Sequence, residues 1–330
     1  MTLSAAVMAL AMALQAPADT GAALYGAWCS SCHGADGRGV SKAMVRLEVP
    51  AADLADCAVS SAEPEDLWIA IVRDGGESVG LSIDMPAFGE AATPEQLRAV
   101  VRYIRGLCGE PGWPPGELNF PRAFLAEKAF PENEVVVEAH GWGQELIYER
   151  RVGRRLQWEA AVRTLADSGG GFDSFTGAVK YNLWHSLERR ALASVGLEVT
   201  PPVGLRDLWE VEPYVAFGWN PGGGGATVIQ GEVLAPWEET EGIAGGQVRL
   251  GIGRQMGRVV PMVEAGWTIP REGQQALALF PQLWVQLSRL GHVAASAGVE
   301  VPVAGPDPKR ARLVAFFLWD YGDGALNRGW

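Results

Sequence analysis

The chain has 330 residues, which is enough for two domains or for one large one. Its formal charge is −12 at pH 7, and it carries no basic stripe that could meet phosphates, so a nucleic-acid partner is not expected. No stretch beyond the N-terminus offers about eighteen consecutive apolar residues, so no helical membrane span is predicted there.

The N-terminal segment 1–18 is apolar and ends in Ala-Pro-Ala, an A-x-A pattern typical of a signal peptide that is cleaved before Asp19. No Lys or Arg precedes the apolar run. An uncleaved anchor helix is the alternative, but the run is short for a membrane span. We therefore expect an exported protein.

A haem-attachment motif follows at Cys29, Cys32 and His33, which form the pattern C-x-x-C-H. This spacing lets each thiol add across a vinyl group of the porphyrin, and it carries the adjoining imidazole under the iron. A C-x-x-C pair can also be a redox dithiol or half of a zinc site, but neither makes good use of the histidine. The motif predicts one covalently bound haem c.

Helices are expected on both sides of this motif. Residues 19–29 place Leu24, Tyr25 and Trp28 on one apolar face and so predict a first helix. A second is expected at 65–73 after a proline. The third begins at a capping box that Thr93 and Gln96 form.

Met85 lies just before the third helix and is the expected second axial ligand of the iron. A thioether opposite an imidazole gives low-spin iron with a raised potential, which suits electron transfer. Pro86 restricts the backbone beside it. The alternative is a methionine that fills a gap in the core. Other side chains that could ligate fit the pattern less well: Met44, His140, His185 and His292.

Residues 19–109 resemble a class I c-type cytochrome. The resemblance rests on Leu24-Tyr25, the attachment motif with Gly34, the Met-Pro-Ala-Phe stretch from Met85, and the pattern Val-x-Tyr-Ile-x-x-Leu at 101–107. It implies an all-α haem domain that passes single electrons. It also implies that the first and last helices cross, with Tyr103 packed at the crossing.

This sequence departs from the cytochrome pattern at one point. No proline lies between Gly34 and Val49, so the usual carbonyl partner of the proximal imidazole is not evident, and Pro50 is the candidate.

Two further cysteines, Cys57 and Cys108, lie inside the same region. In an oxidising compartment such a pair is expected to form a disulfide, and two buried free thiols are the alternative.

The composition changes after the haem region. Residues 110–132 are rich in proline and glycine and predict a linker that proline stiffens. From 133 to 330 apolar and polar residues alternate, which predicts strands with one apolar and one polar face. The expected strands are 134–141, 143–152, 155–166, 175–186, 190–200, 208–220, 226–237, 246–256, 258–269, 276–289, 293–303 and 311–322.

Most of these strands exceed the usual globular length of about five or six residues. Short and long connections largely alternate, which favours an antiparallel up-and-down β-barrel of about ten to twelve strands. The tight junction at 141–143 breaks the alternation, so the first two segments could also be one bent strand. The fold class is therefore two-domain, an all-α cytochrome c domain followed by this barrel.

Strand length and many tryptophans near strand ends favour an outer-membrane barrel. A soluble periplasmic β-sandwich or lipocalin-like barrel is the alternative. The last residue, Trp330, also resembles the terminal aromatic of outer-membrane barrels. Polar inward residues such as Glu232, Arg249 and Glu264 are expected to line a solvated lumen rather than to form a catalytic set. The three histidines beyond the haem region are expected to lie apart, on separate strands.

The order of the parts resembles the porin–cytochrome fusions of bacterial outer membranes, some of which oxidise ferrous iron outside the cell; this barrel is shorter than theirs. The resemblance implies a haem electron-transfer protein whose partner is a redox protein or an extracellular electron donor or acceptor. The haem domain would be periplasmic or inside the barrel lumen.

Two other functions remain open from the sequence. One is a soluble periplasmic cytochrome whose β-domain docks an oxidoreductase. The other is a pore-forming barrel with a haem plug. No hydrolytic arrangement of residues stands out, so an electron carrier is favoured over a catalyst.

Overall fold

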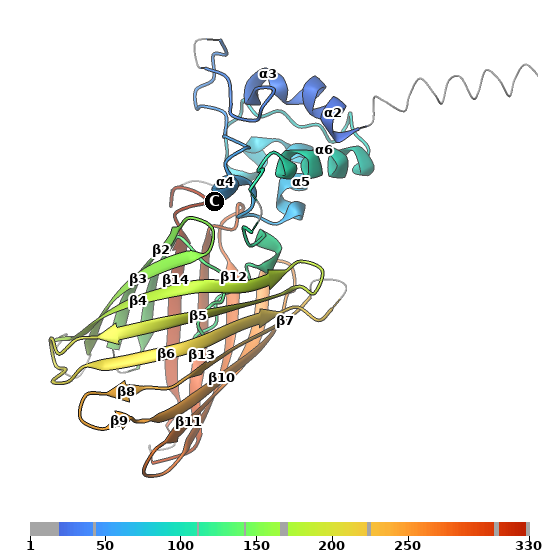
Figure 1. Cartoon of the computed structure of the whole chain (residues 1–330). Helices are drawn as coiled ribbons and strands as arrows, with labels where there is room; N and C mark the ends of the chain where they lie inside the picture. The colour runs from blue at the N-terminus through green and yellow to red at the C-terminus, as the bar shows by residue number, and fades with distance from the viewer. Residues whose placement is uncertain are drawn as a thin grey trace, which may run out of the picture. The chain divides into compact units, whose positions relative to one another are not determined.

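The computed structural model describes residues 20–41, 44–110, 112–141, 143–165, 171–222, 226–306 and 310–327. The expected signal peptide and the terminal aromatic lie outside these residues. The chain divides into a unit that ends at Gly116 and a unit that begins at Glu117 (Figure 1). None of the helices that the structure describes is long and apolar enough to span a membrane.

The first unit is helical, as predicted. Its elements are α2 (Gly21–Trp28), α3 (Ser30–His33), α4 (Cys57–Ser60), α5 (Glu65–Asp74), η1 (Gly76–Val79) and α6 (Pro94–Gly106). The capping box at the start of α6 is confirmed: the Gln96 N–H donates to Thr93 Oγ1 at 3.3 Å, and the Thr93 N–H donates to Gln96 Oε1 at 2.9 Å.

Helices α2 and α6 cross, as the resemblance implied. A Cβ on Gly21 would lie 2.2 Å from the carbonyl oxygen of Ala99, so the helices approach closely only because this residue has no side chain. The rings of Tyr25 and Tyr103 pack at the same crossing with centroids 5.2 Å apart. The predicted disulfide between Cys57 and Cys108 is also confirmed.

The second unit is a closed antiparallel barrel. Its twelve long strands are β1 (Glu134–His140), β2 (Gly143–Val152), β3 (Leu156–Leu165), β4 (Gly171–Ser186), β5 (Ala191–Thr200), β6 (Glu210–Trp219), β7 (Thr227–Leu234), β10 (Gly245–Arg254), β11 (Val259–Pro270), β12 (Ala276–Gln286), β13 (Val293–Ala304) and β14 (Arg312–Asp320). Each pairs with its neighbour in sequence, and β1 pairs with β14 to close the barrel.

The up-and-down topology and the upper limit of the strand count are thus confirmed. The first two segments are separate strands, because Glu138 on β1 lies opposite Glu145 on β2. Strand β4 begins four residues before its expected start, beside a register shift in its pairing with β3. The short strands β8 (Trp237–Glu238) and β9 (Gly242–Ile243) form a small extension beside β6.

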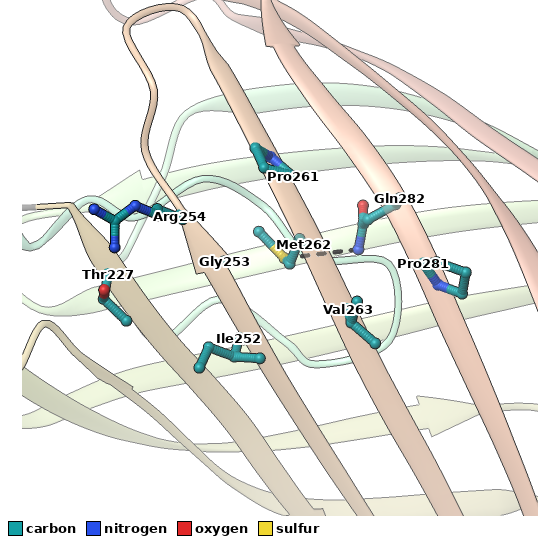
Figure 2. Close-up of a pocket in the computed structure, with 9 residues that line it drawn as sticks. All are labelled: Thr227, Ile252, Gly253, Arg254, Pro261, Met262, Val263, Pro281 and Gln282. Carbon is teal, nitrogen blue, oxygen red and sulfur yellow. Dashed lines mark hydrogen bonds between the residues drawn. The ribbon is translucent and has the colours of Figure 1, made fainter.

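The barrel is apolar outside. Every long strand presents at least one large apolar side chain that is more than a third exposed. Examples, one from each long strand in chain order, are Val137, Leu146, Val162, Val179, Leu197, Val215, Val233, Leu250, Val263, Leu283, Val301 and Leu313. Figure 2 shows this alternation on β11, where the exposed Val263 follows the buried Met262. The Met262 sulfur accepts a hydrogen bond from the buried Gln282 amide of β12 at 3.7 Å.

The barrel interior is mixed, with polar groups beside apolar clusters such as that of Val136, Phe316 and Leu318. Buried side chains on its strands include charged and amide groups: Glu138, Glu149, Gln157, Lys180, Gln230, Glu232, Glu264 and Gln282. Burying an unpaired charge costs several kcal/mol, so these groups need partners within the lumen.

Residues 118–133 supply those partners from inside the barrel. Leu118, Phe120 and Phe130 are at most 5% exposed and share one core cluster with side chains of β5, β6 and β7. Most of the stretch that composition marks as a linker is therefore packed against the inner wall. We refer to residues 118–133 as the lumen segment.

Arg122 is the most heavily paired cation of the lumen segment. Its guanidinium contacts Glu149 at 2.5 Å, Glu134 at 3.6 Å and Glu138 at 3.8 Å, and the Arg122 side chain is 7% exposed. Lys128 forms a second buried ion pair of the lumen segment, with its Nζ 2.8 Å from Glu134 Oε1.

The turn of the lumen segment is held through its backbone. The carboxylate of Glu264 accepts hydrogen bonds from three successive backbone N–H groups, those of residues 124–126, at 2.6–3.1 Å. Arg249 donates to the Leu125 carbonyl at 2.9 Å and pairs with Glu232 at 2.9 Å. Three successive N–H groups form an anion-binding concavity, so the wall carboxylate fixes the shape of the turn.

Replacing Arg122 by Gln should leave buried carboxylates without a counter-charge. We expect the free energy of unfolding to fall by about 3–5 kcal/mol. The matched control is Arg312→Gln, because Arg312 pairs with Glu300 at 3.4 Å with its own side chain 29% exposed. This control should lower the free energy of unfolding by about 1 kcal/mol or less. Urea unfolding followed by tryptophan fluorescence measures both, and equal losses would contradict the pairing scheme.

Candidate haem centre

The attachment motif lies where α2 passes into α3. Cys29 is buried and Cys32 is half-buried, and both are free thiols because the other two cysteines form the disulfide. The hydroxyl of Tyr25 on α2 donates to the carbonyl of Gly34 at 2.7 Å. This bond ties the end of the motif back to the helix that delivers it.

The Cys29 thiol differs from that of a reactive redox cysteine. Burial raises the pKa of the Cys29 thiol to about 11, and the neighbouring Cys32 adds to the rise. Redox-active C-x-x-C motifs depend on a lowered thiol pKa. The direction of the Cys29 shift is therefore opposite to the one that a redox dithiol requires.

His33 is oriented by a backbone carbonyl. Its Nδ1 lies 3.1 Å from the carbonyl oxygen of Ala52, which leaves Nε2 as the ring nitrogen for a metal. Pro50 was the candidate for this role, and the structure places Ala52 in it instead, two residues later. Burial lowers the pKa of His33, against the opposing effect of the Ala52 hydrogen bond, which favours the neutral ring that a ligand requires.

Met85 lies beside the same core. It packs against the cluster that contains Cys29, together with Trp28 and Phe88, whose rings stack at 5.3 Å. The backbone at Met85 is fixed by Gly76, whose N–H donates to the Met85 carbonyl at 3.0 Å. A Cβ on Gly76 would lie 2.4 Å from the Ser82 carbonyl oxygen, so this approach also needs a glycine.

The residues present fit a covalently bound haem. Two thiols, one neutral imidazole and one thioether are the donor set that haem c attachment and axial ligation use. The buried indole Nε1 of Trp68 has no hydrogen-bond partner among the described residues. A buried donor without a protein acceptor marks a place where a bound group with acceptor oxygens would be accommodated.

Sequence reasoning missed two of these features. The Ala52 carbonyl carries no side-chain signal, and only the path of the loop brings it to the imidazole. The unpartnered indole nitrogen of Trp68 carries no sequence signal either, because it depends on what α5 packs against.

The other histidines lie on separate barrel strands or turns, as expected. His140 contacts Glu138 at 3.2 Å, His185 contacts Asn182 at 2.9 Å, and His292 contacts Ser288 at 3.1 Å. The interior carboxylates Glu232 and Glu264 differ from expectation. They are at most 1% exposed and accept hydrogen bonds from the lumen segment, so these two carboxylates do not face a solvated lumen.

Residues 16–104 match the protein family described as cytochrome C oxidase, cbb3-type, subunit III. This cytochrome family implies a haem. No curated protein matches the chain.

The chain also has partial similarity to solved structures of outer-membrane channels and porins. One is an outer membrane channel from Pseudomonas putida F1, with 11% identity and a TM-score of 0.46, covering 61% of this chain and 99% of that one. Another is the KdgM porin, with 9% identity and a TM-score of 0.44, covering 56% and 96%. The NanC porin has 9% identity and a TM-score of 0.40, covering 56% and 97%. These TM-scores are too low to assign the barrel to a family.

Proposed function

We propose that this protein is a haem c electron carrier that its own filled β-barrel anchors in the bacterial outer membrane. Cys29 and Cys32 would hold one haem covalently, and His33 and Met85 would be the side chains that bind its iron. The bound haem supplies a one-electron couple. The Ala52 carbonyl holds the His33 ring in position, and the stacked aromatic pair beside Met85 keeps water from the core.

The observation that supports this proposal most is the inverted polarity of the barrel. Apolar side chains face outward on every long strand, and charges are buried inside. A soluble barrel would bury its apolar face and solvate its polar face, whereas lipid demands the reverse. The outward face therefore supports a membrane barrel over a soluble docking domain.

Exposed tryptophans lie at both ends of the strands. Trp158, Trp184 and Trp219 are near the end with short turns, and Trp209, Trp237 and Trp267 are near the end with long loops. Two such rings match the two interfaces of a bilayer, where the indole has an apolar body and a polar N–H.

The lumen segment supports an anchor rather than an open pore. Its side chains and backbone bond to wall residues on opposite sides of the barrel, including Glu149 of β2 and Glu264 of β11. An open channel needs a continuous aqueous path, and the packed segment occupies that space. A passive pore therefore receives less support than an anchored electron carrier.

The lumen segment also supports a periplasmic haem domain. Phe120, near its start, packs at Gly218, one residue before the end of β6 at the short-turn rim. Asn133, at its end, accepts a hydrogen bond from the Arg151 N–H at the same rim. Short turns are periplasmic in outer-membrane barrels, so the chain that precedes the segment emerges on that side. The partner of the haem would then be a periplasmic redox protein.

Variants of the two cysteine pairs test the haem site. A double change of Cys29 and Cys32 to Ser should abolish covalent haem on denaturing gels, because no thiol remains to bond the vinyl groups. Changing Cys57 and Cys108 to Ser instead should leave the covalently bound haem in place. Met85→Ala should keep haem attached but lose the far-red sulfur–iron band of the ferric protein. Covalent haem in the first variant would refute the assigned attachment site.

Outward-facing leucines test the membrane assignment. Leu250 lies in the middle of β10, and Leu313 lies at the start of β14; they are 49% and 76% exposed. Arg costs about 2–4 kcal/mol at the bilayer midplane and about 0–1 near the interface. Leu250→Arg should therefore lower the fraction of folded barrel in membranes much more than Leu313→Arg. Equal tolerance of both changes, judged by heat-modifiable gel mobility, would favour a soluble barrel.

A further inference from the structure

We propose that Glu138, His140 and Glu145 form a binding site for a divalent transition-metal cation inside the barrel, near the long-loop rim. Glu138 and His140 are two residues apart on β1 and so face the same side of the sheet. Glu145 on β2 lies directly opposite Glu138. One ligand atom from each residue lies within 4.8 Å of the others, which is close enough for a single ion to reach all three.

The chemistry of these donors selects a class of ion. One imidazole nitrogen and two carboxylate oxygens suit Zn²⁺ and related first-row cations, and three protein ligands leave a further position open. Calcium and magnesium prefer oxygen ligands alone. The site therefore favours a transition metal over the common hard cations.

The charges of Glu138 and Glu145 also favour a bound cation. Glu138 and Glu145 are like charges placed directly opposite each other, an arrangement that destabilises a strand pair. Arg163 contacts Glu145 at 3.0 Å, and Arg122 contacts Glu138 at 3.8 Å. An ionised carboxylate has about four acceptor positions, so both residues retain capacity for an ion beside these arginines.

His140 supplies the position where the ion would bind. Its Nε2 lies 3.2 Å from Glu138 Oε2, which is a hydrogen-bond distance. Coordination at Nε2 would replace this hydrogen bond with a bond to the metal. The His140 side chain is 16% exposed, and the exposed Gly141 follows it at the end of β1, so the site can be reached from the rim.

The other carboxylate clusters carry no such inference. Glu132 and Glu134 share a cluster with Asp320, but the Lys128 ammonium already lies 2.6 Å and 2.8 Å from the two glutamates. A third cluster, of Glu127, Glu149 and Glu159, is contacted by Lys180 and Arg122. Side-chain cations lie beside these carboxylates, as they do at Glu138 and Glu145, but neither cluster offers an imidazole, which is the donor that distinguishes the proposed site.

Zinc binding to the full-length, haem-loaded protein in detergent tests the proposal. Equilibrium dialysis against Zn²⁺, with metal counted by mass spectrometry, should give one zinc per chain, and excess Ca²⁺ should not displace it. His140→Ala should weaken zinc binding by more than the roughly 10–100-fold that loss of an outer-sphere partner costs. Glu145→Gln should also weaken zinc binding.

The matched control is His185→Ala, which removes another strand histidine at the opposite end of the barrel and should leave zinc binding unchanged. His140→Gln is a second variant that keeps a side chain of similar polarity, and heat-modifiable gel mobility verifies that each variant is folded. Absence of stoichiometric zinc in the wild type would overturn the proposal. Equal zinc binding by wild type and the folded His140 variants would overturn it as well.

Discussion

The second unit depends on one constraint: a barrel with charges inside and apolar side chains outside must pair its interior charges without water. Strand glutamates such as Glu149 and Glu264 are fully buried. The lumen segment meets the constraint, because Arg122 brings a guanidinium to several carboxylates and successive N–H groups satisfy Glu264. Without the segment these groups would be buried and unpaired, or the lumen would have to fill with solvent.

This constraint links the two units of the chain in function. The same chain that carries the attachment motif enters the barrel and completes its interior. We interpret the barrel as an anchor for the haem domain rather than as an open channel, since the chain's own lumen segment occupies its interior. In the helical unit, the close crossing at Gly21 packs α2, the helix that leads into the attachment motif, against α6, and the Ala52 carbonyl orients the His33 ring.

Much of this architecture could be predicted from sequence, because its signals are local. Alternation with a period of two indicated all twelve long strands, and the capping box at Thr93 indicated the start of α6. The attachment motif predicts Cys29, Cys32 and His33 as haem-binding residues, since covalent chemistry fixes their spacing. The Cys57–Cys108 disulfide followed from counting the cysteines of a chain that was expected to be exported.

What could not be predicted depends on contacts distant in sequence. Residues 110–132 have the composition of a linker, and only the positions of wall glutamates show that Arg122 and Lys128 belong inside the barrel. The Ala52 carbonyl was missed for the same reason, since a backbone acceptor has no sequence signature. The cluster around His140 depends on strand register, which pairs Glu138 with Glu145 and cannot be fixed from alternation alone.

The most direct test of a membrane-anchored haem carrier is to follow covalent haem through cell fractionation. Outer membranes floated on a density gradient and washed with alkaline carbonate should retain the full-length, haem-stained chain. Detergent should then release it with a spectrum of low-spin haem c. Haem-stained full-length chain in the soluble periplasm, without detergent, would contradict the account.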